Sequence, residues 1–368
     1  MFATALLLVI LAVSLVLPGC VRAPEPPREA PKPAQPAQPQ PQRPKWWGGV
    51  EPLSPAVKVR AGLKGVPSDG GVLIAKDRGY FQDMGLDVEI LNFNSGQEII
   101  NPMAAGHLDV GLAVTDAALF NAILRGLPIK IVADKGTNIP KRPYYHLVVR
   151  KDLQDKIKDY KDLNGRKLAV VGTGSLDEIC LDRVLKKGGM STKGNDIDLV
   201  VIKAFPDMLA AMANKSIDGA MLIEPFIVNG VEKDICVRWK DPSEYEPDAQ
   251  IAIVIYGPSM TSKPEVAKRF MMAYLKALRD YNDAFIKNKG VDAMIDTLCR
   301  VSLTKDPALY RKMNPAGLNP NGYVKVSGID ADLAWYKDRG LLKGEIKAAD
   351  VVDHQYVEFA LKAMGKYE

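Results

Sequence analysis

The sequence predicts an α/β fold with two lobes, each built on a mixed, mostly parallel sheet that is flanked by helices. Three observations support this prediction: a strand–turn–helix–strand unit at residues 57–93, an alternation of strand and helix patterns after it, and a weak internal echo. Alternating strands and helices are typical of parallel sheets covered by helices. Two such units facing one another would place their Gly-rich loops around a single cleft.

The first unit offers a ligand site at the end of its first strand. Residues 57–63 alternate between apolar and polar side chains, which is the period of a strand. A Gly-rich turn at 65–71 leads into an apolar helix expected over 72–84, which Gly85 ends, and the alternation resumes at 86–90. The turn brings flexible backbone and a helix N-terminus to the carboxyl end of a parallel strand, where ligands commonly bind.

The internal echo indicates a second unit of the same design. Residues 104–112 resemble residues 213–221, and each segment leads into a short apolar strand. Each strand then ends at an acidic residue in a turn, Asp116 in the first copy and Glu224 in the second. A second Gly-rich loop, residues 172–175, precedes the second copy as 65–71 precedes the first. Chance similarity is the alternative, because an acid followed by a strand of small residues is common.

The N-terminal segment predicts export and membrane attachment. Residues 2–17 are sixteen almost unbroken apolar residues, which is short for a membrane-spanning helix of roughly 20 residues. Gly19 and Cys20 then resemble the end of a bacterial lipoprotein signal, so that residues 1–19 would be removed and Cys20 lipidated. An uncleaved anchor helix is the alternative. Residues 20–45 are rich in Pro and Gln and predict an extended tether.

Composition argues against several classes of function. The formal net charge is +5, and no Lys/Arg cluster is interleaved with aromatic residues, so nucleic acid is not an expected partner. Cys180, Cys236 and Cys299 are widely spaced without a CxxC pair, so no zinc site and at most one disulfide are expected. The three histidines are scattered, which leaves little for a His-assisted nucleophile. We expect no metal, no cofactor and no catalysis.

Several short motifs resemble one known family. The chain is similar to the solute-binding proteins of nitrate/sulfonate/taurine/bicarbonate-type ABC importers, whose relatives include proteins that bind pyrimidine precursors of thiamine. The resemblance rests on Ala75–Phe81, Gly85–Glu89, Gly106–Gly111, Glu224–Phe226, Trp335–Leu341 and Val351–Asp353.

The resemblance implies the type II fold of periplasmic binding proteins, in which the chain crosses twice between two lobes. It implies a first lobe of residues 55–142 plus 248–368 and a second lobe of 143–247, with the crossing strands at 144–149 and 249–256. It also implies a monomer that binds a small molecule, docks on ABC permease subunits and lies on the extracytoplasmic face of the membrane.

The expected ligand contacts lie in Gly-rich loops and at strand ends. Thr115 and Asp116 are implied partly by the resemblance, as are Glu224 and Phe226 facing them from the second lobe. Asp116, Ser95 and Ser175 equally suit helix caps, and Phe226 equally suits a core position. The complete set of expected contacts is Ser68, Asp69, Gly70, Ser95, Gly96, Thr115, Asp116, Thr173, Gly174, Ser175, Asp177, Glu224 and Phe226.

The ligand class stays open at this point. If Asp69, Asp116, Asp177 and Glu224 point into the cleft, they would repel a bare oxoanion and favour a neutral or cationic organic ligand such as a pyrimidine or an aminoalkane sulfonate. If they serve as caps, a bare oxoanion such as nitrate or sulfate becomes a candidate ligand again. An extracytoplasmic sensor is the alternative to an importer subunit. A pyrimidine-synthase-like enzyme is less favoured, since the chain lacks the Cys-rich iron cluster of those enzymes.

Overall fold

The structure is a computed structural model, and it describes residues 46–94, 96–247 and 249–368. The predicted signal segment, Cys20, the tether and Ser95 therefore lie outside the described residues. Within the described part, no helix combines the length and apolarity that crossing a membrane requires. Cys180, Cys236 and Cys299 are all free thiols.

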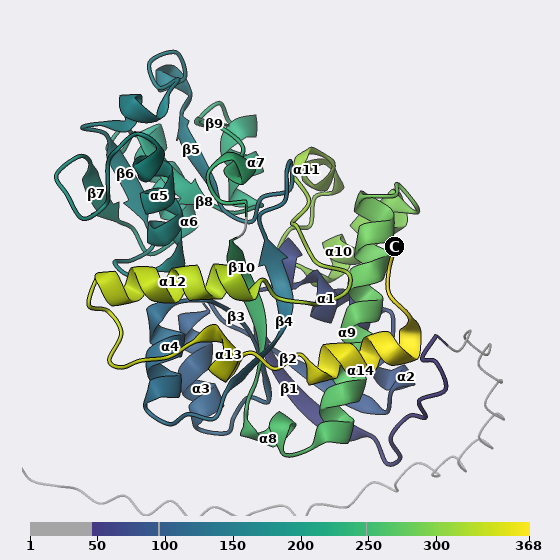
Figure 1. Cartoon of the computed structure of the whole chain (residues 1–368). Coiled ribbons are helices and arrows are strands. Elements are labelled where there is room, and N and C mark those ends of the chain that lie inside the picture. Colours follow the sequence, from purple (N-terminus) through teal and green to yellow (C-terminus); the bar gives the residue numbers. More distant parts are fainter. Residues whose placement is uncertain (1–45, 95, 248) are drawn as a thin grey trace, which may run out of the picture. The chain divides into compact units, whose positions relative to one another are not determined.

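Two five-stranded sheets form the frame of the protein (Figure 1). The first has the order β2-β1-β3-β10-β4 and the second the order β7-β6-β8-β5-β9. The strands are β1 Val57–Leu63, β2 Leu86–Asn92, β3 Val110–Val114, β4 Lys130–Thr137, β5 His146–Arg150, β6 Lys167–Val170, β7 Asp198–Val201, β8 Gly219–Leu222, β9 Cys236–Arg238 and β10 Gln250–Tyr256.

The two sheets share one pattern of strand directions. In the first, β1 is parallel to β2 and β3, while β10 is antiparallel to both β3 and β4. In the second, β6 is parallel to β7 and β8, while β5 is antiparallel to both β8 and β9. The two echoed segments of the sequence lead into β3 and β8, which hold the same place in their sheets. The internal echo therefore corresponds to a structural repeat.

Helices cover both sheets, as parallel strands buried on both faces require. The long helix α9 packs against α1 and α14 over the first sheet. The helices are α1 Gly70–Asp77, α2 Tyr80–Asp83, α3 Ile100–Ala104, α4 Ala117–Leu124, α5 Leu176–Lys187, α6 Phe205–Ala213, α7 Phe226–Glu232, α8 Pro258–Thr261, α9 Pro264–Phe285, α10 Val291–Val301, α11 Pro307–Lys312, α12 Val326–Asp338, α13 Ala348–Val351 and α14 Gln355–Met364.

The helix expected over residues 72–84 is divided in two. It begins earlier, at Gly70, and α1 ends at Asp77 before α2 starts at Tyr80. Gly79 between them has a φ of 74°, in the left-handed region that glycine adopts without strain. The prediction of one continuous helix was wrong because an apolar pattern does not show where a glycine turns the chain.

The chain crosses between the sheets in loops rather than in strands. It leaves the first sheet after β4 and enters the second at β5, so the first crossing is residues 138–145. It returns between β9 and β10, through residues 239–249. The expected crossing strands were therefore wrongly placed, since β5 and β10 each lie within a single sheet. The lobe boundaries fall inside these two loops and stay a prediction.

Candidate ligand-binding site

A small cavity lies where segments of the two sheets meet. Its volume is about 20 Å³, which is room for about one water molecule. The turn after β1, the first crossing, the end of β8 and the segment after α11 all contribute to it. The lining residues are Pro67, Ser68, Pro143, Tyr144, Ile223, Glu224, Asn314 and Ala316. The structure thus brings together Ser68 and Glu224, one predicted contact from each side.

A fully buried ion pair lies next to this cavity. Lys135 Nζ of β4 is 2.9 Å from Asp69 Oδ1, and neither side chain is exposed. The other carboxylate oxygen of Asp69 accepts hydrogen bonds from the backbone N–H groups of Lys64 and Val66, at 3.1 and 3.0 Å. Asp69 therefore ties the turn after β1 to β4. Burial acts to lower the pKa of Lys135, but Asp69 and Tyr144 more than offset it, so the pKa is raised and the ammonium stays charged.

Lys135 stands at a β-bulge. On β10, the adjacent residues Ala252 and Ile253 face Gly136 and Asp134, so Lys135 has no partner across the ladder. A bulge inserts one extra residue and changes the direction of the side chains around it. Lys135 is not among the contacts that the sequence predicted. The signal for it was a charged pair, Asp134 and Lys135, followed by glycine inside an otherwise apolar strand.

Tyr144 lies against this bulge and reaches Lys135. A Cβ atom on Gly136 would lie 2.4 Å from Tyr144 Cδ2, so only glycine allows the ring to pack on this backbone. The hydroxyl oxygen of Tyr144 accepts a hydrogen bond from Lys135 Nζ at 3.2 Å. Burial acts to raise the pKa of Tyr144, but the charges of Lys135 and Lys64 together more than offset burial, and the pKa is lowered to about 8. Tyr144 was also missed in the sequence, where it was expected only as part of a crossing.

Glu224 is paired rather than free. Its Oε1 accepts a hydrogen bond from Arg238 Nη2 at 2.6 Å and from the backbone N–H of Asn314 at 3.4 Å. Its Oε2 accepts from the backbone N–H of Val228 in the first turn of α7, at 3.0 Å. Burial raises the pKa of Glu224 although Arg238 opposes this. The carboxylate thus holds α7 and the segment after α11 together across the cavity.

The loop of residues 172–175 does not line the cavity. Gly174 lies so close to the segment after α12 that an added Cβ would be 2.9 Å from Leu341 Cδ1. The backbone N–H of Gly174 donates to Glu178 Oε2 at 2.6 Å, Ser175 Oγ donates to the Gly172 carbonyl at 2.5 Å, and Thr173 is exposed. The polar groups of the loop are therefore largely used within it.

Asp177 is fully buried at the start of α5. Its Oδ2 accepts a hydrogen bond from the backbone N–H of Val171 at 2.6 Å, and its Oδ1 has no hydrogen-bond partner. Burial raises the pKa of Asp177 to about 6. The carboxyl group is thus mostly committed to the local turn.

The other predicted contacts of the first sheet have structural partners. Thr115 Oγ1 lies 2.8 Å from Asp332 Oδ2 and 3.1 Å from the Gln250 carbonyl oxygen. Asp116 accepts a hydrogen bond from the backbone N–H of Leu119 at 2.8 Å, as a cap of α4. Gly96 is buried against β3, and Gly70 begins α1. None of these residues lines the cavity.

Phe226 is half-buried at the start of α7. Its ring lies 5.4 Å from that of Phe205, at an interplanar angle of 33°. The contact continues through Tyr145 to Tyr144, whose rings lie 5.4 Å apart. Phe226 is therefore connected to the cavity through a row of aromatic rings, without lining it.

Helix α12 connects the two sheets on another side. Asp332 in this helix accepts hydrogen bonds from Thr115 of the first sheet and from Arg183 of α5, the latter at 2.7 Å. One turn further, Trp335 Nε1 donates to Asp182 at 2.8 Å, and directly after the helix Arg339 Nη2 donates to Asp182 at 2.9 Å. We call this cluster the α12 brace; its members are Asp182, Arg183, Asp332, Trp335 and Arg339.

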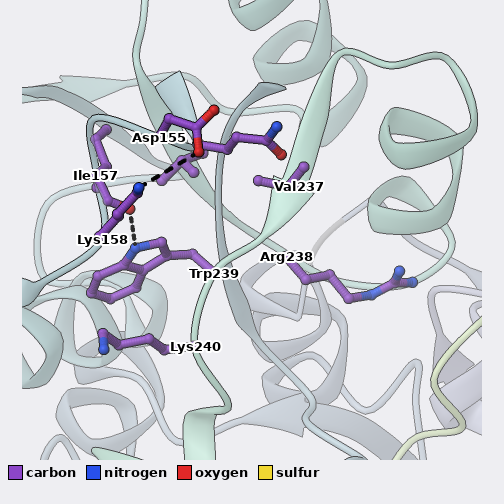
Figure 2. Close-up of a pocket in the computed structure, with 9 residues that line it drawn as sticks. Asp155, Ile157, Lys158, Val237, Arg238, Trp239 and Lys240 are labelled. Atoms are coloured by element: carbon purple, nitrogen blue, oxygen red, sulfur yellow. Dashed lines mark hydrogen bonds and ion pairs between the residues drawn. The ribbon is translucent and has the colours of Figure 1, made fainter. Parts of the chain in front are cut away.

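A larger hollow lies on the second sheet alone (Figure 2). It encloses about 400 Å³ and is lined by residues of β5, β9 and the segment 154–158. Trp239 Nε1 donates to the Ile157 carbonyl at 2.8 Å, while Figure 2 shows Arg238 extending away from the hollow. The hollow contains none of the predicted contacts and nothing from the first sheet. We therefore place the candidate site at the smaller cavity.

Sequence comparison gives relatives over part of their length. The model of the family described as NMT1/THI5 like matches residues 67–283. A 4-amino-5-hydroxymethyl-2-methylpyrimidine phosphate synthase of Schizosaccharomyces pombe is 28% identical over 153 residues, which are 42% of this chain and 40% of the relative. A Brucella abortus protein whose name describes a binding protein is 27% identical over 216 residues, 57% of this chain and 62% of the relative. The chain thus spans less than two thirds of either.

Solved structures share the fold over nearly their whole length. The alkanesulfonate-binding protein SsuA of Xanthomonas axonopodis pv. citri, bound to MOPS, has a TM-score of 0.65 at 19% identity, covering 82% of this chain and 100% of that one. The periplasmic nitrate-binding protein NrtA of Synechocystis PCC 6803 has a TM-score of 0.68 at 15% identity, covering 84% and 89%. These matches confirm the predicted type II fold of periplasmic binding proteins.

Proposed function

Because the chain belongs to the NMT1/THI5-like family, we propose that it is the substrate-binding protein of an ABC import system, with two lobes that close on one small polar ligand. The observation that carries this proposal is the cavity, which joins Ser68 from the first sheet and Glu224 beside the second. A site made by both sheets is formed only when they approach each other. Binding is thereby coupled to closure, as in hinged binding proteins.

The charges around the cavity support a ligand with anionic or neutral polar groups. Asp69 is paired with Lys135, and Glu224 is paired with Arg238. Asp116 caps a helix, and Asp177 is bound to its own turn. The four carboxylates therefore do not present a free negative charge to the cavity. We propose a ligand among sulfonates, nitrate or bicarbonate, pyrimidines and aromatic acids.

We further propose that the protein is attached to the membrane and docks on a permease. Cys20 would carry a lipid on the extracytoplasmic face of the membrane, and residues 20–45 would let the binding domain reach a permease. The cavity of about 20 Å³ is too small for a sulfonate, so the ligand would enter with the sheets further apart. The closed, loaded form would then dock on the permease.

A thermal-shift screen of the purified protein tests this proposal. The panel holds nitrate, bicarbonate, ethanesulfonate, taurine, benzoate and a 4-aminopyrimidine. A ligand at 100 times its Kd adds about 2.7 kcal/mol of stability, which raises the Tm by a few degrees. Cooperative unfolding with no shift for any compound would contradict the proposed ligand classes.

Two alternatives are separated by further assays. An extracytoplasmic sensor would bind the same ligand, but deleting its gene would leave ligand uptake by cells unchanged. The similarity to a yeast pyrimidine phosphate synthase makes a synthase-like enzyme the second alternative. That alternative requires a pyrimidine phosphate product, which mass spectrometry would detect.

A further inference from the structure

The buried ammonium of Lys135 determines how two hydroxyl groups at the cavity can bond. Lys135 Nζ lies 3.2 Å from Ser68 Oγ and 3.2 Å from the Tyr144 hydroxyl oxygen. An ammonium group donates hydrogen bonds and cannot accept them. Both hydroxyl oxygens must therefore act as acceptors toward Lys135, and each keeps its own hydrogen for another partner.

At least one hydroxyl hydrogen is left for a ligand. Lys135 donates to both hydroxyl oxygens, so the hydrogens of Ser68 and Tyr144 have to be donated to groups other than Lys135. Ser68 and Tyr144 both line the cavity, so the cavity is where that donor can find an acceptor.

The remaining walls of the cavity offer little competition for this donor. Both oxygens of Glu224 already accept hydrogen bonds, from Arg238, Asn314 and Val228. Four other lining residues, Pro67, Pro143, Ile223 and Ala316, have apolar side chains, and Asn314 adds an amide group. The polar face of the cavity thus consists of the hydroxyl donor, with a positive charge directly behind it, and the Asn314 amide.

This donor is held in place before any ligand arrives. Asp69 fixes Ser68 by binding two backbone N–H groups of the same turn and the ammonium of Lys135. Gly136 fixes Tyr144 by allowing its ring to pack on the bulge. Fixed donors lose little freedom on binding, so their hydrogen bonds contribute more to affinity.

We propose that Lys135 is a positioning residue that makes the Ser68–Tyr144 hydroxyl pair a hydrogen-bond donor to the ligand, so that the site selects an anionic oxygen acceptor such as a sulfonate, carboxylate or nitrate group. The inference rests on the proposed function and narrows its ligand class. The raised pKa of Lys135 keeps the ammonium charged at neutral pH, so the direction of these hydrogen bonds is fixed.

Titration calorimetry on the whole protein tests the inference. The probes are ethanesulfonate, nitrate, benzoate and the dication putrescine. The decisive variant combines Ser68→Ala with Tyr144→Phe, and Tyr144→Phe alone is the second variant if the first does not unfold cooperatively. We expect the anions to bind, and the variant to weaken the best anion by about ten- to a hundredfold, since hydrogen bonds to charged groups are worth that much.

The matched control is Tyr256→Phe. This buried tyrosine also donates its hydroxyl hydrogen, to the Ala267 carbonyl at 3.0 Å, but it does not line the cavity. We expect it to leave the Kd unchanged within about twofold, the scatter expected for independent sites.

A selectivity measurement separates positioning from a structural role. The variant Lys135→Met with Asp69→Asn removes both charges of the buried pair together, which avoids leaving one charge alone. We expect it to abolish the preference for ethanesulfonate over its neutral analogue ethyl methyl sulfone. A purely structural change would weaken both compounds equally and would overturn the role of Lys135.

The outcomes distinguish the inference from the proposed function. An unchanged anion affinity in the double hydroxyl variant would overturn the inference alone, as would putrescine binding more tightly than the anions. If the 4-aminopyrimidine of the thermal-shift panel binds the unmodified protein and the anions do not, the inference fails and the proposed function stands. If no compound of either panel binds, the proposed function fails and the inference fails with it.

Discussion

The two places where the sheets meet are built differently. At the α12 brace, a helix places Asp332 between Thr115 of one sheet and Arg183 of the other, both within 2.8 Å of its carboxylate. At the cavity, a direct bond across is the 3.4 Å contact from the Asn314 backbone N–H to Glu224 Oε1. The ion pair of Lys312 with Glu232 lies nearby, with side chains 54% and 37% exposed.

This difference indicates whether the two sheets separate at the cavity or at the α12 brace. Breaking buried charged contacts is costly, while exposed ion pairs contribute little to stability. The sheets would therefore separate at the cavity while the α12 brace keeps them joined. The brace is then part of the hinge, and the cavity is the mouth through which a ligand enters.

The strongest test of this comparison is to remove Arg183. The variant Arg183→Met leaves Asp332 and Glu246 buried without their cation. We expect a loss of about 3–5 kcal/mol in the free energy of unfolding, measured by urea denaturation. The loss should be larger at pH 8 than at pH 5, because burial already raises the pKa of Asp332 to about 7 and its carboxyl group can take up a proton at the lower pH.

The control for Arg183 is Arg311→Met, whose pair with Asp292 is exposed on both sides. That change should lower the free energy of unfolding by about 0–1 kcal/mol. Equal losses in the two variants would show that the brace is no stronger than a surface pair, and the proposed hinge would have to be abandoned.

A second test addresses the two crossings between the cavity and the brace. His146 and Trp239 join them, because His146 Nε2 donates to the Trp239 carbonyl at 2.8 Å. Burial lowers the pKa of His146 to about 4. The unfolded chain, with an ordinary pKa of about 6.5, takes up a proton first as the pH falls. The contribution of neutral His146 to the free energy of unfolding is therefore fully present above pH 6.5 and declines toward pH 4.

The expected decline from His146 is on the order of 3 kcal/mol over that interval. His146→Gln keeps a donor for Trp239 but does not titrate, so its urea-denaturation curve should depend less on pH between 6.5 and 4. A variant with the same pH dependence as the unmodified protein would rule out His146 as the cause.

A third test changes the packing of Tyr144 at the cavity and leaves the α12 brace intact. Gly136→Ala would place a Cβ atom 2.4 Å from the Tyr144 ring, so the ring has to move. We expect a stability loss of about 1–3 kcal/mol, as for other overpacked sites, together with weaker binding of ethanesulfonate. In the control Gly344→Ala, the new Cβ meets only the end of the Leu124 side chain, at 3.2 Å. Unchanged binding in Gly136→Ala would show that Tyr144 does not contact the ligand.

The smallest effect is expected at Asp116, which lies away from the mouth. Asp116→Ala removes the cap of α4 and should cost about 1 kcal/mol, while Asp116→Asn keeps a capping oxygen and should cost less. We expect neither variant to change the Kd for the ligand. Weaker binding by the Asn variant would restore Asp116 as a ligand contact.

The sequence predicts the fold better than the site. Local patterns locate β1, β2 and the echoed strands β3 and β8, because alternation and turn residues are local properties. The break at Gly79 and the course of the two crossings depend on how the chain packs, which no local pattern contains. Ser68 and Glu224 could be predicted because strand ends in such sheets face a common cleft.

The residues that the sequence analysis missed act through distant partners. Lys135 meets Ser68, which is 67 residues away, and Asp332 meets Thr115 at a separation of 217 residues. Asp116 and Thr115 look like ligand contacts in the sequence, but the structure gives them a cap and a brace partner. A single sequence shows that a residue is polar and placed near a strand end, and not which partner it will have.

The position of β10 has a consequence for how the protein is made. This strand lies between β3 and β4, yet the whole second sheet separates it from β4 along the chain. Until β10 emerges from the ribosome, β3 and β4 each leave a row of backbone N–H and C=O groups unpaired. Such open edges promote aggregation, and pairings between distant segments form slowly. A pause in synthesis before residue 250 would therefore leave the nascent chain most prone to self-association.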